Sequence, residues 1–335
     1  MTKGRMRLLA GLAVSAVCLY LALRSVDPAK LVEAYRGASY IYLVPAVVLT
    51  ILINWARAYR WRLLMYPNDR QPLGRLFSMV NIGYLFNSAL PAKVGEVVRG
   101  YLAGRLLPGG MAQALSTLLV ERLLDVLTLV LLLAGLLPVV ALPRWSVTAG
   151  LVFGAAALGG TALLVVLARL GPGALDRLWG VVGRVPGLGD RRVRAALEHL
   201  LDGLRVLTVG RRLPGIAFWS LLIWAGYVFC NYTTLVAFHL GHLSPMAAAV
   251  TVCATGLSMV VPSSPGAFGP VEGAVIFALA LYGVGESQAF AYAFGQHALN
   301  IAVLVVLGLW GLRSESLSFS SVRERALGGA EESPQ

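Results

Sequence analysis

The sequence of 335 residues has few charged side chains: 13% are Asp, Glu, Lys or Arg, against about 25% in ordinary soluble domains. Its three cysteines stand apart in apolar surroundings, so they are interpreted as small core residues rather than metal ligands. The H-E-x-x-H, nucleophile-elbow and P-loop patterns do not occur in it. These absences argue against a soluble enzyme, a metal centre and an ATP-driven pump, and we expect no cofactor and no metal.

By contrast, 58% of the residues are hydrophobic, and several apolar runs reach the ~20 residues that a helix needs to cross ~30 Å of hydrocarbon. The sequence therefore predicts an all-α, polytopic integral membrane protein with about six full spans. We place these spans at about 6–24, 40–62, 111–140, 147–169, 214–238 and 287–312. Residues 1–315 then form a single transmembrane domain, followed by a short cytoplasmic tail at 316–335.

Basic residues outnumber acidic residues by 28 to 16, which gives a net charge of +12. They gather in alternate loops, a pattern that fits the positive-inside rule better than a nucleic-acid surface. We therefore expect a multi-pass protein of a bacterial-type inner (plasma) membrane, with both termini cytoplasmic and the first span retained. Arg57, Arg60 and Arg62 are assigned to the cytoplasmic side, and 170–212 to a cytoplasmic segment that contains an amphipathic helix.

Helix breakers interrupt two of the apolar segments. Residues 73–105 contain Pro91, and residues 243–284 contain Pro265. Each proline lies 51 residues after the predicted start of the preceding full span, so we predict two re-entrant helical hairpins in an inverted repeat. The first half-repeat covers about 40–140 and the second covers about 214–312. Paired interruptions of this kind point to the binding site of a transporter.

Three charges lie inside the predicted span at 111–140: Glu121, Arg122 and Asp125. Glu121 and Asp125 are four residues apart, so they share one face of a helix. A charge at membrane depth costs several kcal/mol, and such residues normally face a cavity or a partner. The neighbouring hairpin carries three more charges, Lys93, Glu96 and Arg99. The two groups are expected either to form one polar chamber or to form an ion-paired knot that only holds helices together.

The second half carries a more neutral set of polar residues. Glu272 follows the interruption at Pro265, and Gln296, His297 and Asn300 occupy positions that mirror those of the first-half charges. His297 is either a proton relay or a hydrogen-bonding residue of helix packing. Helix breaks free backbone N–H groups, and helix N-termini favour anions. The two hairpins therefore predict a pocket for a phosphate-bearing headgroup.

At these residues the chain resembles the lysylphosphatidylglycerol synthase transmembrane-region family, whose members are flippase-like proteins. The resemblance is carried by the motifs RAYRWRLL, IGYLFNSALPAKVGEVVRGYLAGR, ALSTLLVERLLDVLTL, VVPSSPGAFGPVEGA and FGQHALNIAVLVV. It implies movement of a lipid between leaflets, typically an aminoacylated phosphatidylglycerol. Bifunctional members add a soluble aminoacyl-transferase domain after the membrane region, whereas only about 20 residues follow the last predicted span here. We therefore do not expect lysyl transfer, and the lipid stays open.

The resemblance and the residue patterns together give two sets of candidate positions. The candidate substrate-binding residues are Asn87, Lys93, Glu96, Arg99, Glu121, Arg122, Asp125, Ser263, Ser264, Glu272 and His297. The hairpin breakers are Pro91, Gly95, Pro265, Gly266 and Gly269.

Three functions remain as hypotheses. The first is a translocase for an anionic or aminoacylated phospholipid or a polyprenyl-phosphate-linked lipid. The second is a non-catalytic membrane scaffold or partner subunit. The third is a membrane-embedded enzyme in which Glu96, Glu121, Asp125 and Glu272 act as acid or base groups. Membrane lipids are the expected partners, with no nucleic acid; a homo-oligomer or a separate soluble partner is compatible with each hypothesis.

Overall fold

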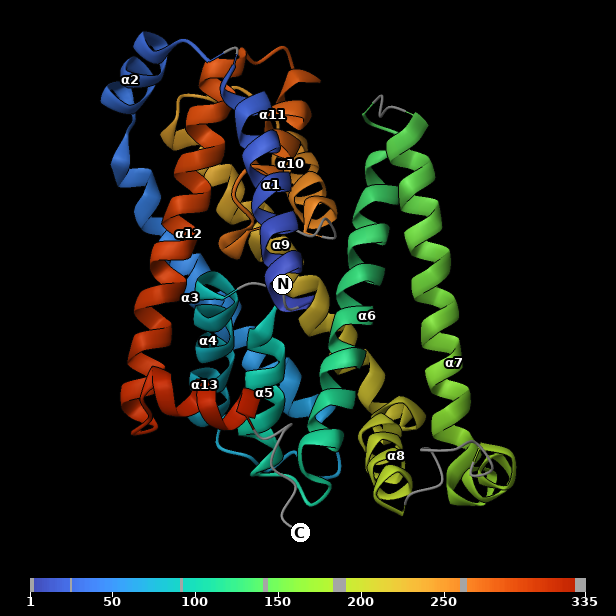
Figure 1. Ribbon diagram of the computed structural model, residues 1–335. Coiled ribbons are helices and arrows are strands. Elements are labelled where there is room, and N and C mark those ends of the chain that lie inside the picture. Colours follow the sequence, from blue (N-terminus) through green and yellow to red (C-terminus); the bar gives the residue numbers. More distant parts are fainter. Residues whose placement is uncertain are drawn as a thin grey trace.

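The computed structural model describes residues 3–24, 26–90, 93–140, 144–182, 191–259 and 264–328, and these residues contain helices and no strand. The α-helices are α1 (Lys3–Leu23), α2 (Pro28–Gly37), α3 (Leu43–Leu64), α4 (Leu73–Ala89), α5 (Val94–Gly104), α6 (Gly110–Leu136), α7 (Arg144–Val182), α8 (Arg191–Leu204), α9 (Leu213–Ala237), α10 (Pro245–Ser258), α11 (Pro270–Ala280), α12 (Glu286–Ser314) and α13 (Phe319–Gly328). Short 3₁₀ turns are η1 (Tyr40–Tyr42), η2 (Arg205–Thr208), η3 (Gly210–Arg212) and η4 (Pro265–Ala267). The all-α prediction is confirmed (Figure 1).

Four helical segments are long and apolar enough to cross a membrane. They are Tyr40–Leu64, Val147–Arg169, Gly210–Ala237 and Glu286–Ser314. A fifth arises if Leu12–Leu23 and Pro28–Gly37, which meet at 85°, form one bent span. Helix α6 has 27 residues, which is long enough to cross a membrane. It contains three charged residues, however, and is therefore not one of these four apolar segments. The chain is thus a multi-pass membrane protein by length and composition.

The two interrupted segments are short helices separated by breaks. Helices α4 and α5 lie in the lower half of Figure 1, and α10 and α11 lie in its upper half. In the first break Lys93 takes a left-handed conformation with φ 53°. In the second, Gly266 and Gly269 have φ 73° and 94°, values that glycine adopts without the Cβ clash of other residues. Pro91 and Ser263 lie outside the described residues.

Helices α3 and α9 pack against each other and run antiparallel. The Thr50 Oγ1 and Cys230 Sγ atoms lie 3.7 Å apart near one end of the pair, and the Arg60 guanidinium donates to Ser220 at 3.1 Å near the other. Helix α4 packs on α12, where a Cβ on Gly308 would meet the Leu85 side chain at 2.4 Å. Small residues at such crossings let helix backbones approach closely in membranes.

Helices α6 and α7 stand side by side, with α7 on the periphery (Figure 1). The amphipathic α8 packs against the start of α6, and a Cβ on Gly203 would meet the Ser116 hydroxyl at 1.8 Å. The tail predicted at 316–335 begins with α13, which packs back onto the first hairpin. Its Phe319 ring stacks on Phe86 with centroids 4.2 Å apart, and Val322 is buried. The start of the tail is therefore part of the folded bundle.

Candidate functional site

Two carboxylates on α6 hold three arginines of neighbouring helices. Glu121 accepts from Arg99 of α5 at 2.9 Å and from Arg57 of α3 at 3.3 Å. Asp125 accepts from Arg57 at 3.1 Å and from Arg60 at 2.8 Å. The spacing of the residues explains the contacts, because Glu121 and Asp125 are i, i+4 on α6 and the two α3 arginines are i, i+3.

Arg122 and Glu96 complete this group at its exposed side. The Arg122 guanidinium is hydrogen-bonded to Glu121 and lies 3.5 Å from Asp125 and 3.9 Å from Glu96. Glu96 in turn lies 3.6 Å from Arg99. The Arg122 side chain is 41% exposed, whereas those of Glu121 and Arg99 are at most 1% exposed. We call the seven residues the arginine cluster: Arg57, Arg60, Glu96, Arg99, Glu121, Arg122 and Asp125.

Neutral side chains fix the orientation of the buried arginines. Arg57 Nε donates to the Tyr227 hydroxyl at 3.1 Å. The Arg99 guanidinium lies 4.3 Å from the centre of the Trp61 ring, a cation–π contact, and the Trp61 indole N–H donates to Thr117 at 3.0 Å. These contacts set the direction of each guanidinium before any ligand arrives.

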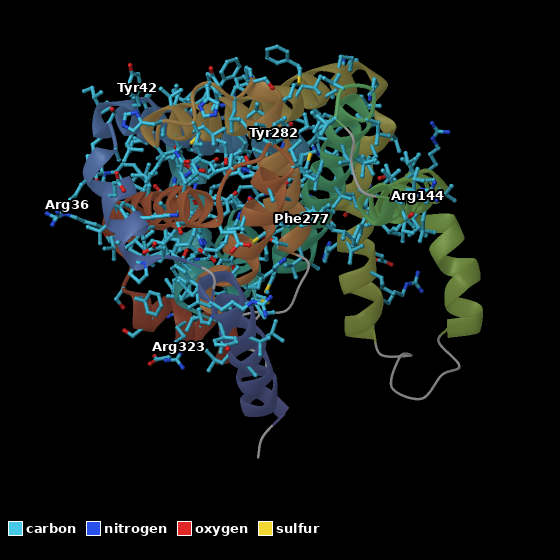
Figure 2. All side chains as sticks on the ribbon, turned by 90° about the horizontal axis from the view of Figure 1, so that it is seen from above. Arg36, Tyr42, Arg144, Phe277, Tyr282 and Arg323 are labelled. Carbon is cyan, nitrogen blue, oxygen red and sulfur yellow. The ribbon has the colours of Figure 1, made fainter. Side chains whose placement is uncertain are left out.

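The cluster contains more positive than negative groups. Four arginines face three carboxylates, so the fully ionised cluster carries one excess positive charge. Among the described residues, the buried Nε–H groups of Arg60, Arg99 and Arg122 also donate to no acceptor, and Glu96 Oε2 is the one oxygen of the cluster that accepts no hydrogen bond while buried. Buried donors normally have partners, so these unused donors together with the excess charge suit an anion. Other arginines, such as Arg36 and Arg323, lie at the periphery of the molecule (Figure 2).

The structure brings together five of the sequence-predicted site residues: Glu96, Arg99, Glu121, Arg122 and Asp125. It places two other candidates elsewhere. Lys93 donates to the Met259 carbonyl at 3.0 Å, so it links the two broken hairpins rather than joining the cluster. Asn87 accepts from the Gly95 backbone N–H at 2.8 Å and fixes the first hairpin. Gly95, predicted to break the hairpin, lies inside the first turn of α5, and a Cβ there would lie 1.9 Å from a backbone oxygen of α4, so glycine permits the close packing of α4 and α5.

The structure adds Arg57 and Arg60, which were not among the candidate site residues, to the buried charges. Their residues are only 5% and 0% exposed, and both pair with carboxylates of α6. The basic motif around them obscured this, because positive residues at the end of a span usually face the headgroups. A signal was nevertheless present: Asn54, Arg57 and Arg60 recur every three residues, which marks one polar helix face, and the two carboxylates of α6 needed more than one cationic partner.

The second half forms a separate polar site around the α11 N-terminus. Glu272 accepts from the Gly269 backbone N–H at 2.6 Å and lies 2.6 Å from His297 Nδ1. Glu272 is fully buried and His297 is 7% exposed, and the Phe268 ring lies 4.8 Å from the imidazole. Among the described residues, neither Glu272 nor His297 is paired with a member of the arginine cluster.

The second break is attached to the first helix. The Ser264 backbone N–H donates to the Ser15 hydroxyl at 2.8 Å, and that hydroxyl donates to Ser264 Oγ at 2.9 Å. A Cβ on Gly269 would meet the Ser15 carbonyl at 2.5 Å, so glycine is required where the break passes α1. Pro265 and Gly266 form the η4 turn between these contacts. Ser264 therefore positions the break and does not reach the arginine cluster.

Comparison with known proteins assigns the chain to a family. The family model described as lysylphosphatidylglycerol synthase TM region matches residues 8–308. This range includes every member of the arginine cluster. The chain belongs to this family. Among the described residues, no group of three or more His, Cys, Asp or Glu side chains could hold a metal.

Two relatives of this lysylphosphatidylglycerol synthase TM-region protein are similar over most of its length. A UPF0104 membrane protein of Methanothermobacter thermautotrophicus is 26% identical over 315 residues, covering 89% of this chain and 92% of its own. The glycosyltransferase AglD of Haloferax volcanii is 27% identical over 360 residues, covering 96% of this chain. The match covers 56% of AglD, so this chain corresponds to little more than half of that protein. No solved structure matches.

Proposed function

We propose that this protein is a lipid translocase that moves a lipid with a phosphate-bearing headgroup between the leaflets of the plasma membrane. One observation carries the proposal: the arginine cluster has one excess positive charge and is open at Arg122, which is 41% exposed. A phosphate group would neutralise the excess charge and accept hydrogen bonds from guanidinium groups, which match phosphate geometry well. Anionic phospholipids, aminoacylated phospholipids and polyprenyl-phosphate-linked lipids share this phosphate chemistry.

The arrangement of the helices supports an inverted repeat. Helices α3, α4, α5 and α6 have 22, 17, 11 and 27 residues, and α9, α10, α11 and α12 have 25, 14, 11 and 29 in the same order. The first helix of each interrupted segment also packs against the last helix of the other half: α4 contacts α12, and α10 contacts α6. Repeats of this kind allow one half to rock against the other around a central site.

The proposed topology has six full spans, with α6 as a charged span and both termini in the cytoplasm. The excess of basic loops on one side supports this orientation. The arginine cluster then lies at membrane depth, where a headgroup has to cross the hydrocarbon. Burial of three arginines between α3, α5 and α6 gives that headgroup a polar surface at this depth.

A leaflet-scrambling assay tests the proposal. Purified protein in liposomes is given fluorescent phosphatidylglycerol, lysyl-phosphatidylglycerol or a polyprenyl phosphate, and movement between leaflets is followed by quenching of the outer leaflet. Arg122→Ala removes the excess charge at the open side of the cluster and should reduce movement at least tenfold. Glu96→Gln should also reduce movement, because it removes the carboxylate that lies 3.9 Å from Arg122.

Glu198→Gln serves as the matched control, because Glu198 pairs with Arg194 on the exposed surface of α8. We expect wild-type movement from this variant. If folded wild-type protein moves none of the three lipids, or if Arg122→Ala moves them at the wild-type rate, the translocase proposal is wrong. The alternative is a scaffold in which the charges only hold helices together; replacing Glu121 and Arg122 together by apolar residues would then preserve both fold and phenotype.

A further inference from the structure

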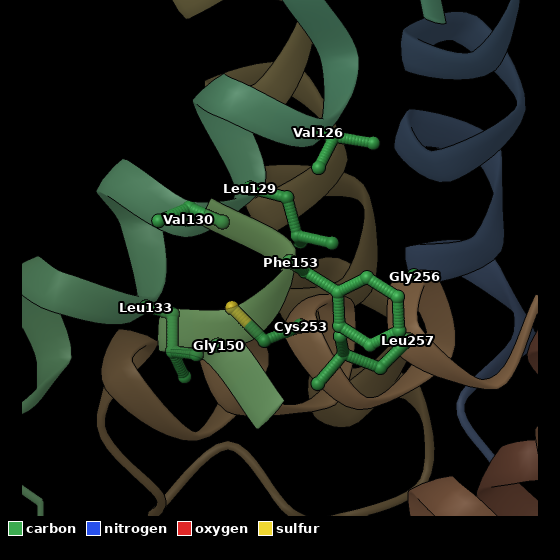
Figure 3. A pocket seen from close by; sticks show the side chains of 9 residues that line it. All are labelled: Val126, Leu129, Val130, Leu133, Gly150, Phe153, Cys253, Gly256 and Leu257. Carbon is green, nitrogen blue, oxygen red and sulfur yellow. The ribbon is translucent and has the colours of Figure 1, made fainter. Parts of the chain in front are cut away.

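A second feature lies beside the arginine cluster: a small apolar pocket of about 50 Å³ between α6, α7 and α10. It is lined by Val126, Leu129, Val130, Leu133, Gly150, Phe153, Cys253, Gly256 and Leu257. Figure 3 shows the side chains of Leu129, Phe153 and Cys253 pointing into the same space. None of these lining side chains carries a charge, so the pocket suits a hydrocarbon ligand.

The pocket continues the exposed end of the arginine cluster along one face of α6. Its α6 residues Val126, Leu129, Val130 and Leu133 lie four, seven, eight and eleven residues after Arg122. These intervals place all five side chains on one helix face. At ~1.5 Å per residue, the distance from Arg122 to Leu133 along the helix axis is ~16 Å. That is about half of the ~30 Å hydrocarbon thickness, the depth of one leaflet.

We propose that the apolar face of α6 holds one acyl chain of the lipid whose phosphate contacts Arg122, and that the pocket receives a segment of this chain. The proposal rests on the proposed function and specifies how the substrate is held. A phosphate at Arg122 satisfies the excess charge of the cluster, and the chain attached to it extends along the apolar face of α6 to Leu133. Along this face of α6 a charged residue is followed by apolar residues, just as the charged headgroup of a phospholipid is followed by its acyl chain.

The order also fixes the direction in which the lipid lies. The headgroup is toward the start of α6 and the chain toward its end. A lipid in the leaflet next to the start of α6 has this orientation. In the proposed site it has moved toward the membrane centre, so that its headgroup reaches Arg122. The site therefore holds a lipid that has left that leaflet and has not yet turned over.

Photolabelling tests the pocket directly. The probe is phosphatidylglycerol with a diazirine near the end of one acyl chain, incorporated into nanodiscs with the full-length protein and photolysed. Mass spectrometry of the peptides should locate adducts on pocket-lining residues, Phe153, Cys253 and Leu257 among them. Diacylglycerol with the same chain lacks the phosphate, so it should label these residues at least fivefold less. Arg122→Ala should reduce labelling by phosphatidylglycerol to the diacylglycerol level.

A pair of variants on α6 provides the matched comparison. Val126→Phe places a ring in the pocket, whereas Leu131→Phe adds the same ring on the 65% exposed side of the helix. We expect Val126→Phe to reduce pocket labelling and lipid movement at least fivefold and Leu131→Phe to change neither. Adducts spread evenly over exposed leucines, or equal labelling by the two lipids, would overturn the acyl-chain site. Labelling of the pocket without any lipid movement would support the site and count against the translocase function.

Discussion

Neutralising Glu121 tests whether the arginine cluster is a network of buried charges. The Glu121 carboxylate is fully buried. It lies 2.9 Å from Arg99, 3.3 Å from Arg57 and 3.8 Å from Arg60, and it is hydrogen-bonded to Arg122. Glu121→Gln keeps the shape of the side chain and removes its charge. Four arginines would then face two carboxylates, and the new amide NH₂ would point donors at guanidinium donors.

The magnitude follows from this loss of pairing. Removing one partner of a buried ion pair costs about 3–5 kcal/mol because the remaining charge is left without compensation. Coulomb's law with an effective dielectric constant of ~20 gives ~4 kcal/mol for one pair at 4 Å, and the desolvation of the buried groups offsets part of the sum over four arginines. We therefore expect Glu121→Gln to lower the free energy of unfolding by about 3–5 kcal/mol.

SDS titration of the purified protein in mixed micelles measures this difference, with loss of helical circular dichroism as the signal. Glu198→Gln is the control, because Glu198 and Arg194 pair at 3.0 Å with side chains 45% and 40% exposed. An exposed pair contributes at most about 1 kcal/mol. If Glu121→Gln lost no more stability than Glu198→Gln, the reasoning about the buried cluster would be refuted.

Two other substitutions test the hairpins. Gly95→Ala should destabilise the protein by about 1–3 kcal/mol, since its Cβ would overlap a backbone oxygen of α4; Gly159→Ala meets nothing within 4 Å and should stabilise α7 by up to ~1 kcal/mol in the same titration. Glu272→Gln should cost about 1–3 kcal/mol, because one amide oxygen cannot replace two carboxylate oxygens that serve Gly269 and His297. An unchanged titration midpoint for Glu272→Gln would contradict the pairing.

Much of the helical framework was predictable from the sequence. Long apolar runs predicted the spans at Tyr40–Leu64 and Gly210–Ala237, because the membrane imposes a minimum length and helices satisfy their own backbone hydrogen bonds. Breaks in the two interrupted segments followed from proline, which cannot continue a regular helix, and from glycine, which is unfavourable inside one.

The candidate site was predictable only in part. Glu121 and Asp125 were identified because charges inside an apolar helix are costly and need partners. Arg57 and Arg60 were missed, since the second span ends among basic and aromatic residues that resemble a headgroup belt. Lys93 was included because of its charge and its position beside the helix break, although its ammonium group binds a carbonyl of the other hairpin. Which charge meets which depends on the packing of α3 against α6, and periodicity along the chain does not encode that packing.

The hydrogen bond from Lys93 to the Met259 carbonyl has a mechanical consequence. It joins the N-cap of α5 to the C-cap of α10, which are 166 residues apart in the sequence. The Lys93 ammonium group can donate to the Met259 carbonyl only while these two helix ends stay within reach of one lysine side chain. The hydrogen bond therefore couples the position of the start of α5 in the first half to the position of the end of α10 in the second half.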